Sequence, residues 1–356
     1  HRLRNDKSAD RPGGQPSRMN TARQVLVTGG AGYVGAVLVP RLLAEGFSVR
    51  VIDLYLFGDH VLDAVKDHPR LEQIKGDIRD QDMLRRAVNG CDTVLHLACI
   101  SNDPSFELDP GLSRSINYDA FSPLVDISEE SGVRRFIYAS TSSVYGVSEA
   151  ENVTEDHPLL PITDYNKYKG LCEPILLNRQ SEDFTTVVIR PATVCGYSPR
   201  QRLDVIVNIL TNHAVNKGRI TIFGGTQMRP NIHIQDMVDL YVLLLRLPKE
   251  SIAGRTYNAG YENHKLSELA EVVRGVVERE MPDRGPIEVV TTESNDPRSY
   301  RISSEKIARE LNFKAKRTIA DAVEELVSAF RAGKLPDSLT DGRYYNINTM
   351  QQLNLE

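Results

Sequence analysis

Short apolar runs rich in β-branched residues alternate with longer amphipathic stretches through the first half of the chain. The stretches between the runs, such as VGAVLVPRLLAEG, have the apolar spacing of helices. Strands that alternate with helices in this way pair in parallel, so the pattern predicts an α/β fold with a doubly wound parallel sheet over residues 23–190. The runs with the length and composition of buried strands are QVLVT, SVRVID, DTVLHLA, RRFIYAS and TTVVIR.

The rhythm changes after residue 190. Shorter strand-like runs, RITIFG, RTYNAG and IEVVTT, are separated there by amphipathic stretches. This predicts a smaller C-terminal α/β domain over 191–335 that binds the substrate, followed by a tail at 336–356. Helices are expected near 234–247, 265–280, 304–311 and 318–332.

The first residues, 1–22, are polar and basic with no hydrophobic region behind them. This composition predicts a disordered extension rather than a secretory signal, with Met19 as a candidate natural start.

Composition narrows the classes of function. The chain has 356 residues, 40% of them hydrophobic, which is enough to bury a sizeable core, and a net charge of −5 without a basic stripe, which argues against nucleic acid as a partner. Its 4 cysteines form no CxxC pair, so we expect no disulfide framework and a cytoplasmic location. No apolar run reaches the length of a membrane span. None of the 8 histidines has an obvious ligand spacing, and we predict no metal.

A glycine motif follows the first predicted strand. In TGGAGYVG, the residues Gly29, Gly32 and Gly35 allow a tight turn and let a pyrophosphate approach the N-terminus of the following helix. Asp53 ends the second predicted strand, where a carboxylate accepts hydrogen bonds from ribose hydroxyls and repels a 2′-phosphate. The motif therefore predicts a Rossmann-type domain that binds NAD rather than NADP.

Further contacts to NAD are expected from the turn itself and from the ends of the third and fourth strands. Asp77, in GDIRD, lies where a carboxylate can reach the adenine, although a helix N-cap is an equally good interpretation of it. The other residues expected to contact the cofactor are Tyr33, Val34, Ile78, Leu97 and Ala98.

Two segments downstream carry candidate chemistry. ASTSSVYG follows a strand and places Thr141 at its end, and YNKYK places Tyr165 and Lys169 four residues apart on one face of a helix. A phenol is a poor base near neutral pH, but an adjacent ammonium group favours the phenolate. Tyr165 is therefore expected to remove a hydroxyl proton, while Thr141 holds the substrate oxygen.

These motifs, in this order, resemble the extended short-chain dehydrogenases/reductases, in the branch of NAD-dependent epimerases and dehydratases of nucleotide sugars. The resemblance covers about residues 23–335 and includes RPNIHIQD at 229–236. It implies that Thr141, Tyr165 and Lys169 form the catalytic trio, that Lys169 also contacts the nicotinamide ribose, and that Asn117 supports the site.

The resemblance also implies the partner, a UDP-, GDP- or dTDP-linked sugar, and the residues that bind it. Arg229 and Arg298 match the arginines that bind the substrate diphosphate, for which a guanidinium is well suited. Two helices, at about 109–131 and 163–180, match those that form a four-helix bundle in the family, so a homodimer is expected. The other residues expected to bind the substrate are Ser101, Ser142, Ser143, Thr193, Asn208 and Phe223, although Thr193 stands where many relatives have Asn.

Ser142 and Ser143 indicate the type of reaction. In the family's sugar 4,6-dehydratases, an acid–base pair, Asp-Glu, occupies these two positions, and a hydroxyl cannot easily replace it. We therefore expect an epimerase that oxidises the sugar transiently at C4, like UDP-glucose 4-epimerase. The alternatives are a 4-dehydrogenase with net NADH formation, a 4,6-dehydratase and a non-catalytic NAD-sensing regulator; Tyr165 and Lys169 disfavour the last.

Overall fold

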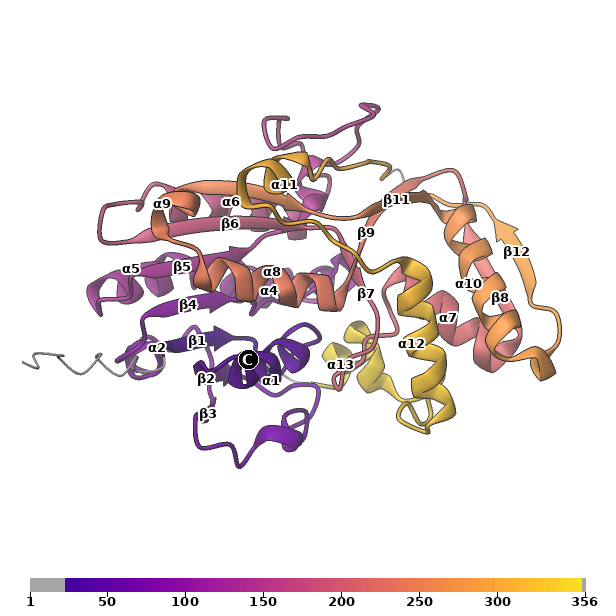
Figure 1. Ribbon diagram of the computed structural model, residues 1–356, viewed down its shortest axis with the longest axis horizontal. Coiled ribbons are helices and arrows are strands. Elements are labelled where there is room, and N and C mark those ends of the chain that lie inside the picture. The colour runs from indigo at the N-terminus through magenta and orange to yellow at the C-terminus, as the bar shows by residue number, and fades with distance from the viewer. Residues whose placement is uncertain (1–22, 297, 354–356) are drawn as a thin grey trace, which may run out of the picture.

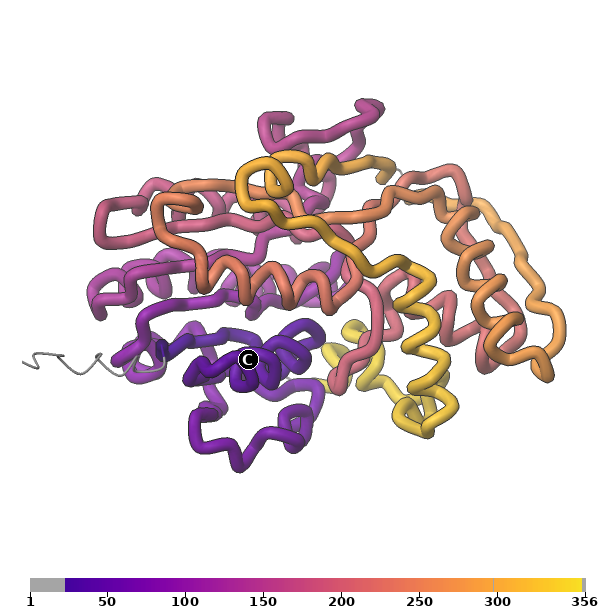
Figure 2. Tube along the Cα trace, in the orientation of Figure 1, coloured from indigo at the N-terminus to yellow at the C-terminus, as the bar shows by residue number. Residues whose placement is uncertain are grey.

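The computed structural model describes residues 23–296 and 298–353, so the extension predicted over 1–22 lies outside the described residues. The chain forms a larger lobe around a central sheet and a smaller, mostly C-terminal lobe beside it (Figure 1, Figure 2). Within the described ranges, no helix is long and apolar enough to cross a membrane.

The larger lobe contains a seven-stranded sheet in which all strands are parallel. The strands lie in the order β10-β6-β5-β4-β1-β2-β3, so the chain adds β2 and β3 on one side of β1 and then crosses to add β4 on its other side. In such sheets, ligands bind at the carboxyl ends of the strands near this crossover point. The strands are β1 (Gln24–Thr28), β2 (Ser48–Asp53), β3 (Leu71–Lys75), β4 (Thr93–His96), β5 (Arg135–Ala139), β6 (Thr185–Pro191) and β10 (Arg255–Ala259).

Helices cover both faces of this sheet. On one face, α1 (Gly35–Ala44) packs against α8 (Ile234–Arg246), and their apolar sides join the strands in one core cluster. On the other face, α5 packs between its neighbours α2 and α6 in a second cluster. The helices of this second layer are α2 (Gln81–Val88), α5 (Phe121–Glu130) and α6 (Asp164–Leu177).

Short elements connect these layers. A π-helical turn at Ser115–Asp119 joins α4 to α5, so residues 110–130 form one interrupted helical run against α6. The remaining short elements of this lobe are α3 (Asp103–Leu108), α4 (Pro110–Arg114), α9 (Lys249–Ile252), α11 (Glu305–Leu311) and the 3₁₀ turns Asp63–Val65 and Ser142–Tyr145.

The smaller lobe has its own core. Three helices, α7, α10 and α12, pack together beside the two-stranded sheet β8-β12, and the three-stranded sheet β11-β9-β7 connects this lobe to the larger one. Its elements are β7 (Thr193–Cys195), α7 (Ile206–Lys217), β8 (Arg219–Phe223), β9 (Met228–His233), β11 (Glu262–Lys265), α10 (Leu266–Glu280), Pro282–Arg284, β12 (Glu288–Thr292), α12 (Ile319–Arg331), Gly342–Tyr344 and α13 (Asn346–Gln352).

The strands and helices expected from the apolar pattern are present, but two segments are distributed differently between the lobes. β10 and α8 lie beyond residue 190 and nevertheless complete the larger lobe, where β10 pairs with β6. The C-terminal stretch, expected as a tail, ends in α13 (Figure 1). This helix packs against α3 of the larger lobe.

Candidate functional site

A cavity of about 670 Å³ lies at the carboxyl ends of the sheet strands, between the two lobes. It brings together most of the residues expected from the sequence to bind the cofactor or the substrate or to take part in catalysis. Those that line it are Gly29, Gly32, Tyr33, Val34, Gly35, Asp53, Ile78, Leu97, Ala98, Ser101, Thr141, Ser143, Tyr165, Lys169, Thr193, Arg229 and Arg298.

The glycine turn lies between β1 and α1. Gly29 has a φ of +74°, and a Cβ atom added to it would lie 2.7 Å from the backbone nitrogen of Ala98. A Cβ atom at Gly35 would lie 2.6 Å from the carbonyl oxygen of Gly29. Only glycine allows the turn to lie this close to the residues that follow β4. The helix α1 begins at Gly35, and no side chain caps its N-terminus. The helix N-terminus is thus available to a phosphate.

Asp53, the last residue of β2, is held by the turn. Its Oδ2 accepts a hydrogen bond from the Ala31 backbone N–H at 3.0 Å, and its Oδ1 accepts one from the Tyr55 N–H at 2.7 Å. Burial raises the pKa of Asp53 above its ordinary value, although these two backbone N–H groups oppose the rise. The carboxylate is fixed in orientation at the edge of the cavity, which suits a ribose of NAD.

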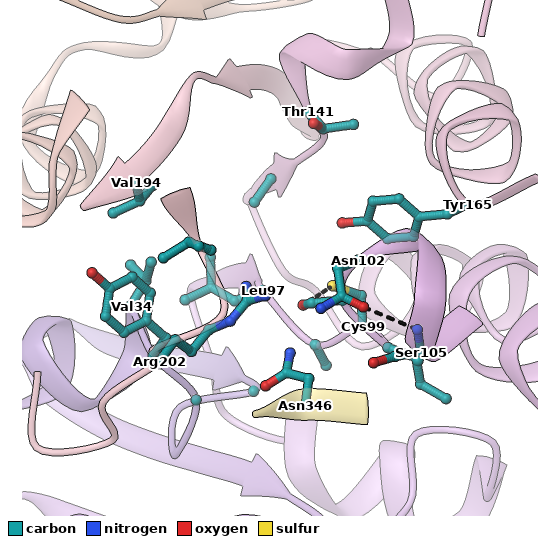
Figure 3. A pocket seen from close by; sticks show the side chains of 18 of the residues that line it. Val34, Leu97, Cys99, Asn102, Ser105, Thr141, Tyr165, Val194, Arg202 and Asn346 are labelled. Atoms are coloured by element: carbon teal, nitrogen blue, oxygen red, sulfur yellow. Dashed lines mark hydrogen bonds between the residues drawn. The ribbon is translucent and has the colours of Figure 1, made fainter. Parts of the chain in front are cut away.

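Thr141 and Tyr165 face the same part of the cavity from β5 and α6 (Figure 3). Thr141 follows the end of β5, and its Oγ1 accepts a hydrogen bond from the Ser143 N–H at 3.2 Å. Tyr165 lies in the first turn of α6, which is capped by Thr163. The two hydroxyl-bearing side chains therefore converge although 24 residues separate them.

The electrostatics of Tyr165 differ from the sequence expectation. Burial raises the pKa of its phenol well above the usual value, the Cys99 thiol adds to this rise, and the Arg202 guanidinium opposes it. Lys169, expected to favour the phenolate, donates instead to the Ala139 carbonyl oxygen at 2.7 Å and lies over the Tyr138 ring.

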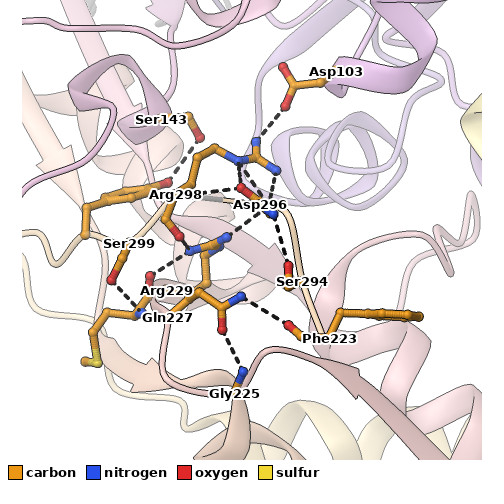
Figure 4. A network of polar contacts seen from close by, with 12 residues as sticks. Asp103, Ser143, Phe223, Gly225, Gln227, Arg229, Ser294, Asp296, Arg298 and Ser299 are labelled. Carbon is orange, nitrogen blue, oxygen red and sulfur yellow. Dashed lines mark hydrogen bonds and ion pairs between the residues drawn. The ribbon is translucent and has the colours of Figure 1, made fainter. Parts of the chain in front are cut away.

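Arg229 and Arg298 lie between this cavity and a second one of about 630 Å³, and they line both. Asp296 joins them: its Oδ2 accepts from Arg298 Nη2 at 2.8 Å and from Arg229 Nη2 at 3.1 Å (Figure 4). Arg298 Nη1 also donates to Asp103 Oδ2 at 2.6 Å. Phe223 is among the residues that line the second cavity, and this residue is 59% exposed to solvent.

Besides Phe223, which lines the second cavity, four predicted site residues do not line the main cavity. Asp77 forms an ion pair with Arg79, and Asp80 rather than Asp77 caps α2. Asn117 is buried and exchanges two hydrogen bonds with the backbone of Ile100.

The other two are buried polar side chains that contact neighbouring protein groups. Ser142 Oγ lies 3.4 Å from the Tyr300 hydroxyl. Asn208 donates to the Tyr33 hydroxyl at 3.0 Å and so connects α7 to the glycine turn.

Sequence reasoning missed several residues that line the main cavity. Three of them, Arg200, Arg202 and Asp204, lie in the segment SPRQRLD. The two arginines of this segment follow a predicted strand closely and could have indicated a binding site for an anionic ligand. No sequence signal indicated the others, because they reach the cavity only through tertiary packing. They include Asn102, Asp103, Tyr300 and residues 345–348 and 350.

The comparisons with known proteins agree with this geometry. A family model described as the NAD dependent epimerase/dehydratase family matches residues 25–260. A dTDP-glucose 4,6-dehydratase from Streptomyces griseus is 30% identical over 312 residues, covering 85% of this chain and 93% of that protein. A UDP-glucose 4-epimerase from Lactobacillus helveticus is 28% identical over 324 residues, covering 84% and 94%.

The fold is shared with solved structures. A dTDP-glucose 4,6-dehydratase from Streptomyces venezuelae, solved with NAD bound, matches with a TM-score of 0.77 at 24% identity, covering 87% of this chain and 98% of that one. These findings confirm the Rossmann-type fold, the predicted family and NAD as its cofactor. The chain belongs to the NAD dependent epimerase/dehydratase family.

Proposed function

We propose that the chain is a nucleotide-sugar epimerase that inverts C4 of a UDP-, GDP- or dTDP-linked sugar. The observation that carries this choice within the family is the pair Ser142–Ser143. Both hydroxyls lie within 3.4 Å of the Tyr300 hydroxyl, with Ser143 at 3.1 Å. A cluster of hydroxyl groups therefore occupies the positions at which a dehydratase needs an acid and a base.

The carboxylates that line the main cavity do not replace that acid–base pair. Asp53 accepts from backbone N–H groups at the cofactor end. Asp103 accepts from Thr163 and Arg298, and Asp204 accepts from Arg202 at 2.9 Å. Each carboxylate already has donors, so none is poised to take a carbon-bound proton in an elimination.

The remaining groups suit the reversible oxidation of an alcohol. Bound NAD supplies the two-electron oxidation and reduction at C4. Thr141 holds the C4 oxygen, and Tyr165 takes up and returns its proton. Because burial disfavours the phenolate, Tyr165 depends on nearby positive charge, which Arg202 contributes in this structure.

The two cavities divide the substrate between them. Arg229 and Arg298 lie where both cavities meet, so a diphosphate bound there places the sugar near Tyr165 and the base near Phe223. An aromatic side chain at the surface of the second cavity suits stacking against a base. This arrangement supports the predicted nucleotide-sugar substrate.

A 4,6-dehydratase is the second candidate, favoured by the relative from Streptomyces griseus at 30% identity. A 4-dehydrogenase with net NADH formation is the third, because the same trio performs its chemistry. All three begin with oxidation at C4, so only the product distinguishes them.

The test is product analysis with substoichiometric NAD. Purified protein is incubated with UDP-glucose, dTDP-glucose or GDP-mannose, and the products are identified by NMR spectroscopy and mass spectrometry. We expect one substrate to reach an equilibrium mixture of C4 epimers without lasting NADH absorbance. A product that has lost water would establish the dehydratase, and NADH formed in proportion to product would establish the dehydrogenase.

A further inference from the structure

Part of the wall of the main cavity comes from the last described residues of the chain. Tyr345, Asn346, Ile347, Asn348 and Met350 line this cavity, and we call residues 345–350 the C-terminal clasp. α13 carries most of the clasp and packs against α3, which follows β4 in the larger lobe. In Figure 3, Asn346 projects from this yellow segment towards the other residues around the cavity. The clasp is thus built into the site although it is far from the cofactor motifs in sequence.

Asn346 connects the clasp to charged groups of the cavity. Its Oδ1 accepts a hydrogen bond from Arg200 Nη2 at 2.6 Å, and its backbone N–H donates to Asp204 Oδ2 at 2.9 Å. The same Asp204 oxygen accepts from Asn102 Nδ2 at 3.2 Å. Asn346 is 4% exposed, so these hydrogen bonds are shielded from water. Side chains from three separate segments therefore meet at one buried point.

Arg200 places this point near the adenosine end of the NAD site. Its guanidinium carbon lies 3.6 Å from the centre of the Phe57 ring, and its charge acts on Asp53, the predicted ribose ligand. Both Asp53 and Phe57 line the cavity. Met350 packs in the same apolar cluster as Ile78, another predicted cofactor contact. The clasp therefore covers the side of the cavity in which we expect adenosine to bind.

Arg200 depends on the clasp for its hydrogen bonding. It is buried, and its Nε has no hydrogen-bond partner among the described residues. Burial also lowers the pKa of its guanidinium to about 9. Since a buried cation with few acceptors is costly, loss of the Asn346 acceptor would free Arg200 to move.

From these contacts we propose that the C-terminal clasp closes the adenosine end of the NAD pocket, and that NAD leaves only after the clasp has been displaced. Asn346 is a positioning residue that holds the clasp through Arg200 and Asp204. The expected consequence is slow exchange of bound cofactor. The inference rests on NAD as cofactor and is independent of the reaction proposed above.

The first test compares two substitutions in the full-length protein. Asn346→Ala removes the acceptor for Arg200, whereas Gln351→Ala changes an exposed residue of α13 that does not line the cavity. Dissociation of NAD is followed by dilution into excess unlabelled cofactor, without any sugar nucleotide. We expect NAD to be released about tenfold faster from Asn346→Ala, because this variant loses one hydrogen bond to a charged group. We expect no change in the release rate for Gln351→Ala. Equal release rates for both variants and the parent would overturn the proposal.

The second test needs no substitution and remains informative if Asn346→Ala folds poorly. Amide hydrogen exchange is measured for residues 342–352 of the parent protein with and without NAD. We expect NAD to slow exchange by at least tenfold both in this segment and in the glycine turn. Protection of the glycine turn without protection of the clasp would refute the inference. For the first test, the same exchange measurement on Asn346→Ala serves as a control. If β1 and β5 of this variant lose as much protection as residues 342–352, the faster release reflects general unfolding and counts against the proposal.

Discussion

Thr141 is the residue at which catalytic and structural roles are most easily separated. Its hydroxyl faces the cavity and also accepts a hydrogen bond from Ser143 N–H. Thr141→Val should reduce kcat by roughly 10²–10⁴-fold, because it removes a positioned hydroxyl. It should also lower the free energy of unfolding by about 1 kcal/mol, because Thr141 Oγ1 caps the 3₁₀ turn Ser142–Tyr145. Ser142→Ala and Ser143→Ala should leave kcat within roughly tenfold of the parent value. Single-turnover kinetics and thermal melts of the three variants check this. Equal kinetic losses in all three would remove Thr141 from the mechanism.

We predict that Asp53 determines the choice between NAD and NADP. The Asp53→Ala variant should bind NAD more weakly, because it loses hydrogen bonds to the ribose, and should discriminate less against NADP, because a negative charge is gone. Isothermal titration calorimetry with NAD and with NADP gives the two dissociation constants. A retained preference for NAD in Asp53→Ala would place the source of selectivity elsewhere in the pocket.

His96, the last residue of β4, should make stability depend on pH. It is buried beside Thr28, and burial, aided by the charge of Lys169, lowers its pKa to about 3. The folded protein keeps His96 neutral while the unfolded chain takes up a proton below about pH 6.5, so stability falls as the pH decreases from 6.5 towards 3.

The matched variant is His96→Gln, which does not titrate. Between pH 6 and 4 the free energy of unfolding of the parent should fall more steeply than that of the variant, by up to about 1.4 kcal/mol per pH unit. Urea denaturation at several pH values measures both slopes. Parallel slopes would mean that His96 takes up its proton over the same pH range in the folded and the unfolded state.

At the scale of elements, the connection from β1 to α1 depends on backbone geometry that can be tested with a paired substitution. Gly29 and Gly46 both have positive φ, +74° and +96°, but an added Cβ atom meets Ala98 at the first and nothing within 4 Å at the second. Gly46→Ala should therefore cost about 1 kcal/mol in stability and leave NAD binding unchanged. Gly29→Ala should cost more and abolish NAD binding. Comparable NAD affinity in the two variants would contradict this account.

The local pattern predicted individual elements well and their assignment to sheets less well. RTYNAG was correctly expected to be a strand, but nothing within it indicates that β10 pairs with β6 rather than with the smaller lobe. Pairing of this kind is set by contacts distant in sequence, whereas apolar periodicity is a local property. The same limit applies to the site. The glycine turn and the Tyr165 helix carry recognisable local motifs, while Asn346 reaches the cavity only because α13 packs against α3.

At the scale of the whole molecule, the remaining question is assembly. The predicted dimer uses residues 109–131 and 163–180, and in the structure α5 and α6 do pack side by side on one face of the larger lobe. Leu171 on α6 is 41% exposed, as expected of an apolar residue that meets a second subunit. The dimer therefore remains a prediction that requires a direct measurement.

Leu171→Arg tests the dimer because it places a charge in the centre of the expected four-helix contact, where no partner is available to it. Analytical ultracentrifugation at micromolar concentration should show the parent as a dimer and Leu171→Arg as a monomer. The control is Leu339→Arg, which changes a leucine of similar exposure, 39%, far from these helices in sequence and should leave the dimer intact. If the parent sediments as a monomer, the predicted assembly is wrong. If both variants remain dimeric, the subunits associate through a different face.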